Sequence, residues 1–139
     1  MTPAISPPLA LTMGEPAGVG PEIIVAALLR ALGATVVEIG APADAISVFG
    51  RAIPVLHHPL PATVEPGRPD PRNAGAVADW IEQAVGLALS GDVGGVVTAP
   101  IAKAPLYAAG FRFPGHTEFI AELTADTPFQ GTRGPVMML

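Results

Sequence analysis

The sequence LALTMGEPAGVGPEIIVAALLRAL, residues 9–32, decides the fold class. Its first part, Leu9–Met13, is a short apolar run and predicts a buried strand. Residues that permit unusual backbone angles follow in Gly14–Gly20, which predicts a loop. Pro21 suits the first position of a helix, and Glu22 favours the positive end of that helix. The stretch therefore predicts a strand, a loop and a helix in succession.

The same alternation continues along the chain. Further strands are expected at Ala34–Ile39, Ala52–Leu56, Val93–Ala99 and Val136–Leu139, and helices at Ile23–Leu32, Pro42–Phe49, Asn73–Ser90, Ile101–Ala109 and His116–Leu123. Between them, residues 57–71 carry five prolines and predict an irregular surface loop. Strands that alternate with helices indicate an α/β fold, with a mostly parallel sheet and helices on both faces.

Composition narrows the functional classes. Half of the 139 residues are hydrophobic, which is enough for a core, and the formal net charge is −5. A single lysine and scattered arginines lack the clustered positive charge of a nucleic-acid surface, so we expect no nucleic-acid partner. Cysteine is absent, which excludes disulfides and thiolate metal sites. No apolar run reaches the roughly 18 residues of a membrane span, so we expect a cytoplasmic protein without a membrane partner.

The last residues, Val136–Leu139, are wholly apolar and predict a strand that stops without a polar tail. We therefore expect residues 1–139 to be the N-terminal portion of a longer protein. Such a portion is expected to expose apolar surface and to associate in solution. The alternative is a genuine C-terminal strand, since some chain ends do pair into sheets.

The first candidate site is the loop between the first strand and helix. Gly14, Glu15, Gly18 and Gly20 lie there, where open α/β sheets bind ligands and where the N–H groups of a helix start suit an anion. The glycine spacing fits neither a dinucleotide fingerprint nor a P-loop. A tight connection that needs positive φ at the glycines is an equally good interpretation.

The second candidate site follows the strand at Val93–Ala99. Thr98 falls at the carboxyl end of that strand, where ligands bind in such sheets. Lys103, in the first turn of the next helix, could neutralise a phosphate. The alternative is a lysine that simply faces water.

The third candidate site is the turn before the helix at His116–Leu123. Gly115 permits close approach of a ligand, and His116 and Thr117 offer an imidazole and a hydroxyl together. Thr117 could instead cap the helix start, a role compatible with binding. His57 and His58 are adjacent in the proline-rich loop and are interpreted as solvated.

Taken together, these segments resemble the 4-hydroxythreonine-4-phosphate dehydrogenase family. The similar segments are MGEPAGVGP at 13–21, TAPIAK at 98–103, FPGHTEF at 113–119 and the final VMML at 136–139. The resemblance covers nearly all of this chain and well under half of a typical family member.

The resemblance implies a fold similar to isocitrate and isopropylmalate dehydrogenases, with two α/β domains in a homodimer. It implies oxidation and decarboxylation of 4-phosphohydroxy-L-threonine with NAD or NADP, in pyridoxal phosphate biosynthesis. His116 and Thr117 match the family's substrate-contacting pair. The family's divalent metal, taken as zinc, magnesium or cobalt, is held by three histidines that would follow Leu139. The resemblance therefore implies that this chain holds no metal ligand and no catalytic residue, and that it is inactive alone.

Two other functions remain open from the sequence. A sister dehydrogenase that acts on phosphorylated threonate or erythronate shares the same motifs. A non-catalytic module could use the same loops to bind an anion or to assemble with a partner.

Overall fold

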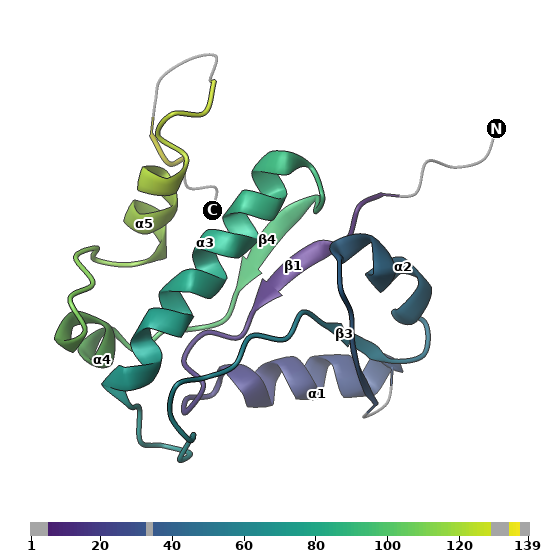
Figure 1. Cartoon of the computed structure of the whole chain (residues 1–139), viewed down its shortest axis with the longest axis horizontal. Helices are drawn as coiled ribbons and strands as arrows, with labels where there is room; N and C mark the ends of the chain where they lie inside the picture. The colour runs from purple at the N-terminus through teal and green to yellow at the C-terminus, as the bar shows by residue number, and fades with distance from the viewer. Residues whose placement is uncertain (1–5, 33–34, 129–133, 137–139) are drawn as a thin grey trace.

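The computed structural model describes residues 6–32, 35–128 and 134–136. Its strands are β1 (Leu9–Thr12), β2 (Val36–Glu38), β3 (Ile53–Val55) and β4 (Gly95–Thr98). Its helices are α1 (Gly20–Leu32), α2 (Ala45–Val48), α3 (Ala74–Ser90), α4 (Lys103–Ala108) and α5 (His116–Leu123), with single 3-10 turns η1 (Pro42–Asp44) and η2 (Pro71–Asn73). Strands and helices alternate as predicted (Figure 1).

The described strands form two parallel pairs. β1 pairs with β4, with Thr12 opposite Thr98, and β2 pairs with β3, with Val37 opposite Pro54. The parallel direction confirms the prediction, but one continuous sheet was expected, and the described strands do not form it. The second pair is only three residues long, and Pro54 has no N–H to donate, which suits β3 to a sheet edge.

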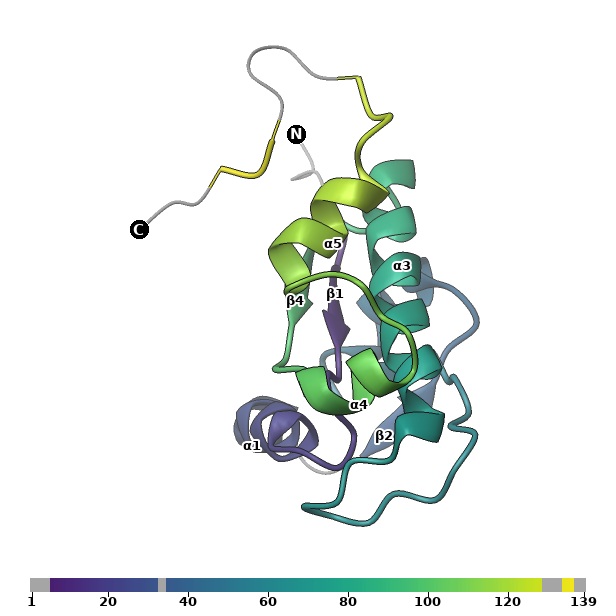
Figure 2. The ribbon, with the colours of Figure 1, turned by 90° about the vertical axis from the view of Figure 1, so that its left-hand side faces the viewer.

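One face of the β1–β4 pair is covered by α3, which packs against both strands (Figure 1). On the other face, Leu9, Leu11 and Val97 are exposed in the part of the chain that the structure describes. The expectation of helices on both faces is therefore wrong for this pair. The reason lies in α1, which runs below the strands in both views instead of crossing their open face (Figures 1 and 2).

The core follows the helical period of α3. Its buried residues are Ala74, Val77, Ile81, Ala84 and Val85. Gly91 ends the helix with φ 84°, and its N–H donates to the carbonyl of Ala88. Glycine reaches this left-handed conformation without a steric penalty, so the expected helix end is confirmed.

The proline-rich segment forms no helix or strand before η2, and both His57 and His58 are exposed, as expected. No described helix has the length and hydropathy to cross a bilayer. Of the strand expected at the C-terminus, residues 137–139 lie outside the described residues, and Val136 is exposed and belongs to no described strand.

Candidate ligand-binding edge

The carboxyl ends of β1 and β4 lie side by side because Thr12 and Thr98 pair in register. Ala99 N–H continues the ladder by donating to the carbonyl of Thr12 at 3.1 Å. Thr12 is 5% exposed, and its buried Oγ1 has no hydrogen-bond partner among the described residues. The loops that follow both strands therefore start at one edge, above a buried hydroxyl that still has bonding capacity.

The glycine loop, residues 14–20, sits directly on the segment after β4. Gly14 has φ 71°, and a Cβ there would overlap the carbonyl oxygen of Pro100 and lie 2.8 Å from the carbonyl carbon of Ala99. A Cβ on Gly20 would overlap the carbonyl oxygen of Met13. The sequence interpretation as a tight connection is thus confirmed at Gly14, whereas Gly18 and Gly20 do not have positive φ.

Glu15 holds this loop in shape. It is 6% exposed, its Oε1 accepts from Ala17 N–H at 3.0 Å, and its carbonyl accepts from Gly18 N–H at 3.0 Å. Its own N–H donates to the carbonyl of Pro100 at 2.9 Å. The loop amides of Ala17 and Gly18 are therefore occupied internally. Any backbone donors for an anion come from the start of α1, where the first N–H groups lack intrahelical acceptors.

The proline-rich loop contacts the glycine loop from the other side. Gly67 N–H donates to the carbonyl of Ala17 at 2.7 Å. Asn73 is buried and binds both backbone groups of Ala62, through Oδ1 at 2.8 Å and Nδ2 at 3.1 Å. Sequence reasoning placed Asn73 at the start of a helix and missed this long-range role. The only sequence signal was a polar side chain before an apolar helical repeat, which is also the signal of a helix cap.

Lys103 is the first residue of α4, and its side chain is exposed. Just before it, Ile101 is half-buried and packs against the core residues of α3. Thus the predicted helix is present but begins two residues later than expected, with the ammonium group in solvent. No hydrogen bond or ion pair joins Lys103 to Thr98 or His116 among the residues that the structure describes.

His116 begins α5, preceded by Gly115 in an extended conformation at φ −179°. Burial lowers the pKa of His116 below its ordinary value, which favours the neutral imidazole near neutral pH. Its Nε2 is buried and has no hydrogen-bond partner within the described ranges. Thr117 is exposed and the helix start has no side-chain cap, so the expected cap by Thr117 is wrong. It is wrong because α5 already begins at His116, one residue before Thr117.

Three phenylalanines hold α5 in place. The rings of Phe111, Phe113 and Phe119 lie with centroids 4.9 to 5.4 Å apart, and Phe119 is buried against Ile81 and Val85 of α3. Ile101 packs on the same cluster. The segment at 98–103 and the segment at 113–119 are therefore connected through this core. The segments at 13–21 and 98–103 are connected through the hydrogen bond from Glu15 N–H to the carbonyl of Pro100.

An open cavity of about 520 Å³ lies between α5, the end of α3 and residues 134–135. Its lining is mostly apolar and includes Thr117, Leu89 at the end of α3, and Pro135. His116 does not line this cavity, although Thr117, the next residue, does. No group of three His, Cys, Asp or Glu side chains that could hold a metal occurs within the described ranges.

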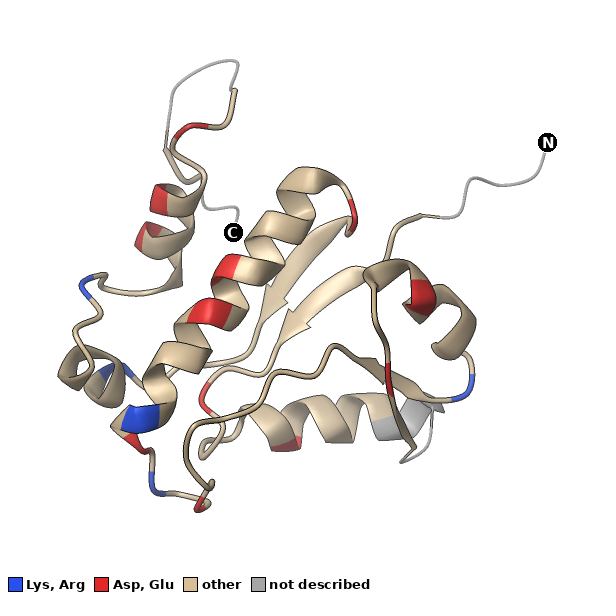
Figure 3. Cartoon of the chain, viewed as in Figure 1, with Lys and Arg blue, Asp and Glu red and all other residues tan. Residues whose placement is uncertain are grey.

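The charged residues in the described part of the chain are spread over separate elements (Figure 3). Acidic residues lie along α3 and α5, whereas Arg51, Arg68 and Arg112 lie in loops and turns, Arg72 lies in η2 and Lys103 in α4. The proposed ligand edge therefore has Lys103 as its candidate positive group, as the sequence indicated.

Parallel strands that alternate with helices, with a glycine loop at the carboxyl ends of β1 and β4, make this an α/β protein, and open sheets of that class bind ligands at this edge. Residues 13–139 match the family model described as Pyridoxal phosphate biosynthetic protein PdxA. The chain belongs to this family.

Relatives of known name agree with this assignment. The chain is 53% identical over 154 residues to 4-hydroxythreonine-4-phosphate dehydrogenase of Caulobacter vibrioides, covering 96% of this chain and 46% of that protein. It is 43% identical to the enzyme of the same name from Maricaulis maris, covering 95% and 47%. The chain thus spans about half the length of the curated relatives it matches.

Solved structures show the same relationship. A crystal structure of 4-hydroxythreonine-4-phosphate dehydrogenase from Klebsiella pneumoniae matches with a TM-score of 0.74 and 33% identity, covering 88% of this chain and 46% of that one. The structure of a 4-hydroxythreonine-4-phosphate dehydrogenase from Burkholderia phymatum matches with a TM-score of 0.74 and 27% identity, covering 87% and 44%.

Proposed function

We propose that the full-length protein is an NAD(P)-dependent 4-hydroxythreonine-4-phosphate dehydrogenase, which oxidises and decarboxylates 4-phosphohydroxy-L-threonine in pyridoxal phosphate biosynthesis. The observation that carries this proposal is the family match over residues 13–139, which contains all three motifs in order. A relative that bears this enzyme name shares 53% identity with the chain.

The proposal includes the organisation of the whole protein. Residues 1–139 would form the N-terminal α/β portion of a larger dehydrogenase with two domains, similar in fold to isocitrate and isopropylmalate dehydrogenases. The enzyme would act as a cytoplasmic homodimer. Support comes from the parallel α/β architecture and from solved dehydrogenases of which this chain covers 46% or less.

In this proposal four residues bind the phosphorylated substrate: His116, Thr117, Lys103 and Thr98. Lys103 is exposed, so a phosphate group of the substrate can reach its ammonium group from solvent and form a charge-assisted hydrogen bond with it. The neutral His116 has bonding capacity left at Nε2 and can donate to or accept from a substrate hydroxyl or carboxylate. Thr98 and Thr117 would contribute hydroxyls at the strand end and at the helix start.

The glycine loop would bind an anionic group through the first amides of α1. Gly14 and Gly20 allow the loop to lie against residues 13, 99 and 100, Gly18 continues the turn, and Glu15 fixes its shape. The carboxylate of Glu15 is committed to Ala17 N–H at 3.0 Å, so its role is to hold the loop and not to contact the anion.

NAD or NADP would supply the hydride acceptor for oxidation of the substrate's 3-hydroxyl, and a zinc, magnesium or cobalt ion would assist. The residues described here do not fit a metal site, because no three ligating side chains converge within the described ranges. By resemblance to the family, we place the metal ligands and most cofactor contacts after Leu139, and we assign to this chain the binding and orientation of the substrate.

An assay of the full-length protein tests the proposal. NADH or NADPH formation would be followed with 4-phosphohydroxy-L-threonine, and in parallel with phosphorylated threonate and erythronate. We expect the first substrate to have the highest kcat/KM. Preference for a sugar-acid phosphate would reassign the protein to a sister activity, and anion binding without turnover of any of the three would indicate a non-catalytic module.

A further inference from the structure

The proline-rich loop is tied to α3 by one buried side chain. Asn73 is 3% exposed, and its amide binds both the N–H and the carbonyl of Ala62, at 2.8 and 3.1 Å. Ala62 is itself buried. Because a bidentate pair fixes both distance and orientation, this contact sets where the loop leaves the start of α3.

The far end of the same loop reaches the proposed ligand edge. Arg68 N–H donates to the carbonyl of Glu65 at 2.9 Å and closes a turn, in which Gly67 has φ 78°. Gly67 N–H then donates to the carbonyl of Ala17, in the glycine loop, at 2.7 Å. Pro66 restricts the backbone between these two contacts, and Pro61 and Pro69 flank them, so a displacement at Ala62 is transmitted to Gly67.

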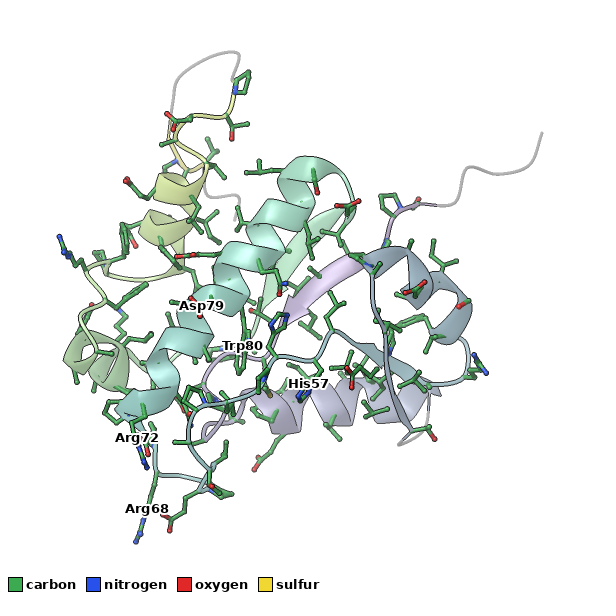
Figure 4. All side chains as sticks on the ribbon, viewed as in Figure 1. His57, Arg68, Arg72, Asp79 and Trp80 are labelled. Atoms are coloured by element: carbon green, nitrogen blue, oxygen red, sulfur yellow. The ribbon has the colours of Figure 1, made fainter. Side chains whose placement is uncertain are left out.

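A purely local role for Asn73 does not fit the geometry. Its side chain makes no capping hydrogen bond to α3, and the turn before the helix is capped by Asp70. A buried amide is costly unless its bonds are satisfied, and Asn73 satisfies them eleven residues back in the chain. Arg72, its neighbour, points outward at the periphery and pairs only with Asp70 in the described contacts (Figure 4).

We propose that Asn73 is a positioning residue for the glycine loop, acting through Ala62 and the loop tip at Gly67. The glycine loop sets the position of the start of α1, which would bind the anion. The conformation of this loop then depends on Asn73, whose side chain makes no contact with the ligand. The nature of the ligand at the glycine loop rests on the proposed function. The link from Asn73 through Ala62 and Gly67 to the loop does not.

Hydrogen exchange on the full-length protein tests the link. We compare Asn73→Ala, which removes the tie, with Gly67→Pro, which removes the donor to Ala17 and also distorts the loop tip, because proline cannot adopt the φ of 78° found there. The matched control is Arg72→Ala, which removes an exposed ion pair beside Asn73. The amides of Ala17 and Gly18 report on the glycine loop, and the amide of Ile81 reports on the core.

Both test variants should accelerate exchange at Ala17 and Gly18 roughly ten-fold, the effect of losing one hydrogen bond to a buried group, while Ile81 stays unchanged. Arg72→Ala should leave all three amides unchanged. Unaltered exchange at Ala17 and Gly18, or equal acceleration at Ile81, overturns the proposal. If Asn73→Ala does not fold, Asn73→Ser, whose shorter side chain cannot make both bonds to Ala62, takes its place.

Titration with inorganic phosphate separates this inference from the function on which it rests. Both test variants should bind phosphate more weakly than the unmutated protein, by up to roughly ten-fold. Unchanged phosphate affinity in both variants would contradict positioning of a binding loop. If the unmutated protein binds no phosphate, the anion role of the loop fails, and the exchange experiment still decides whether Asn73 positions it.

Discussion

His116 shows how a single residue at the proposed ligand edge depends on its surroundings. Burial, without a compensating charge, lowers the pKa of its imidazole from the ordinary value of 6.5. The neutral ring can donate or accept a hydrogen bond, and an arriving anion would favour its protonation. The affinity of the site for an anion is thus coupled to proton uptake by this residue.

The first prediction concerns stability and pH. Above pH 6.5 His116 is neutral in both the folded and the unfolded protein, so it adds no pH dependence there. As the pH falls through 6.5, the unfolded chain takes up a proton that folded His116 resists, and the free energy of unfolding decreases until the folded pKa is passed. Urea midpoints of the full-length protein between about pH 8 and about pH 5 should show this decrease, and His116→Gln should reduce it. An identical pH profile in the variant would contradict the burial of His116.

The second prediction concerns Gly14. A methyl group there would overlap the carbonyl oxygen of Pro100, and the residue would keep a φ of 71° that side chains disfavour. We expect Gly14→Ala to lower the free energy of unfolding by at least about 2 kcal/mol. The control is Gly86→Ala in α3, which has open space and should raise stability by about 0.5–1 kcal/mol. Urea denaturation measures both, and equal effects of the two substitutions would show that the close approach at Pro100 is absent.

At the level of elements, α3 organises the site although it contributes none of the predicted binding residues. It packs on β1, β4, α4 and α5, and therefore joins the strand ends to the helices that begin with Lys103 and His116. The contact to α5 depends on Phe119 and its two neighbouring rings.

The third prediction follows from this contact. Phe119→Ala should cost about 3–5 kcal/mol, the usual loss for a buried phenylalanine, and should loosen α5 together with His116. Tyr107→Ala removes an exposed ring of α4 and should cost much less. Thermal unfolding compares the two variants, and a mild effect of Phe119→Ala would mean that α5 is held by other contacts.

At the scale of the whole molecule, the open face of the β1–β4 pair exposes apolar side chains in the described part of the chain. Leu9 is 64% exposed and Val97 46% exposed, with Leu11 between them on the same face. Contiguous apolar surface of this kind favours association in water.

The fourth prediction is that the 139-residue chain self-associates in solution with increasing concentration. Light scattering should report this association, and Leu9→Lys combined with Val97→Lys should weaken it. A variant with Gln83→Lys adds charge at an exposed polar position on α3 and serves as the control. A monomer at all concentrations would show that this face does not drive association.

The arrangement of the proposed site was only partly predictable. The motifs at Thr98 and His116 were placed correctly at a strand end and a helix start, because apolar periods and turn residues act locally. The pairing of the strands into two separate sheets was not predicted, since register and partner choice depend on contacts between distant residues. The buried hydroxyl of Thr12 was also missed, because threonine in a strand does not reveal which face is covered.

The sequence by itself determined the order and type of the elements, the helix end at Gly91, the irregular proline-rich loop and the family resemblance. These features depend on backbone preferences and hydrophobic periods that span only a few residues. Only the tertiary structure decided that Thr12 lies beside Thr98, and that Asn73 reaches the glycine loop through Ala62 and Gly67. The physical reason is that each of these contacts joins chain segments whose approach is set by the packing of α3 on β1 and β4, and local sequence does not encode that distance.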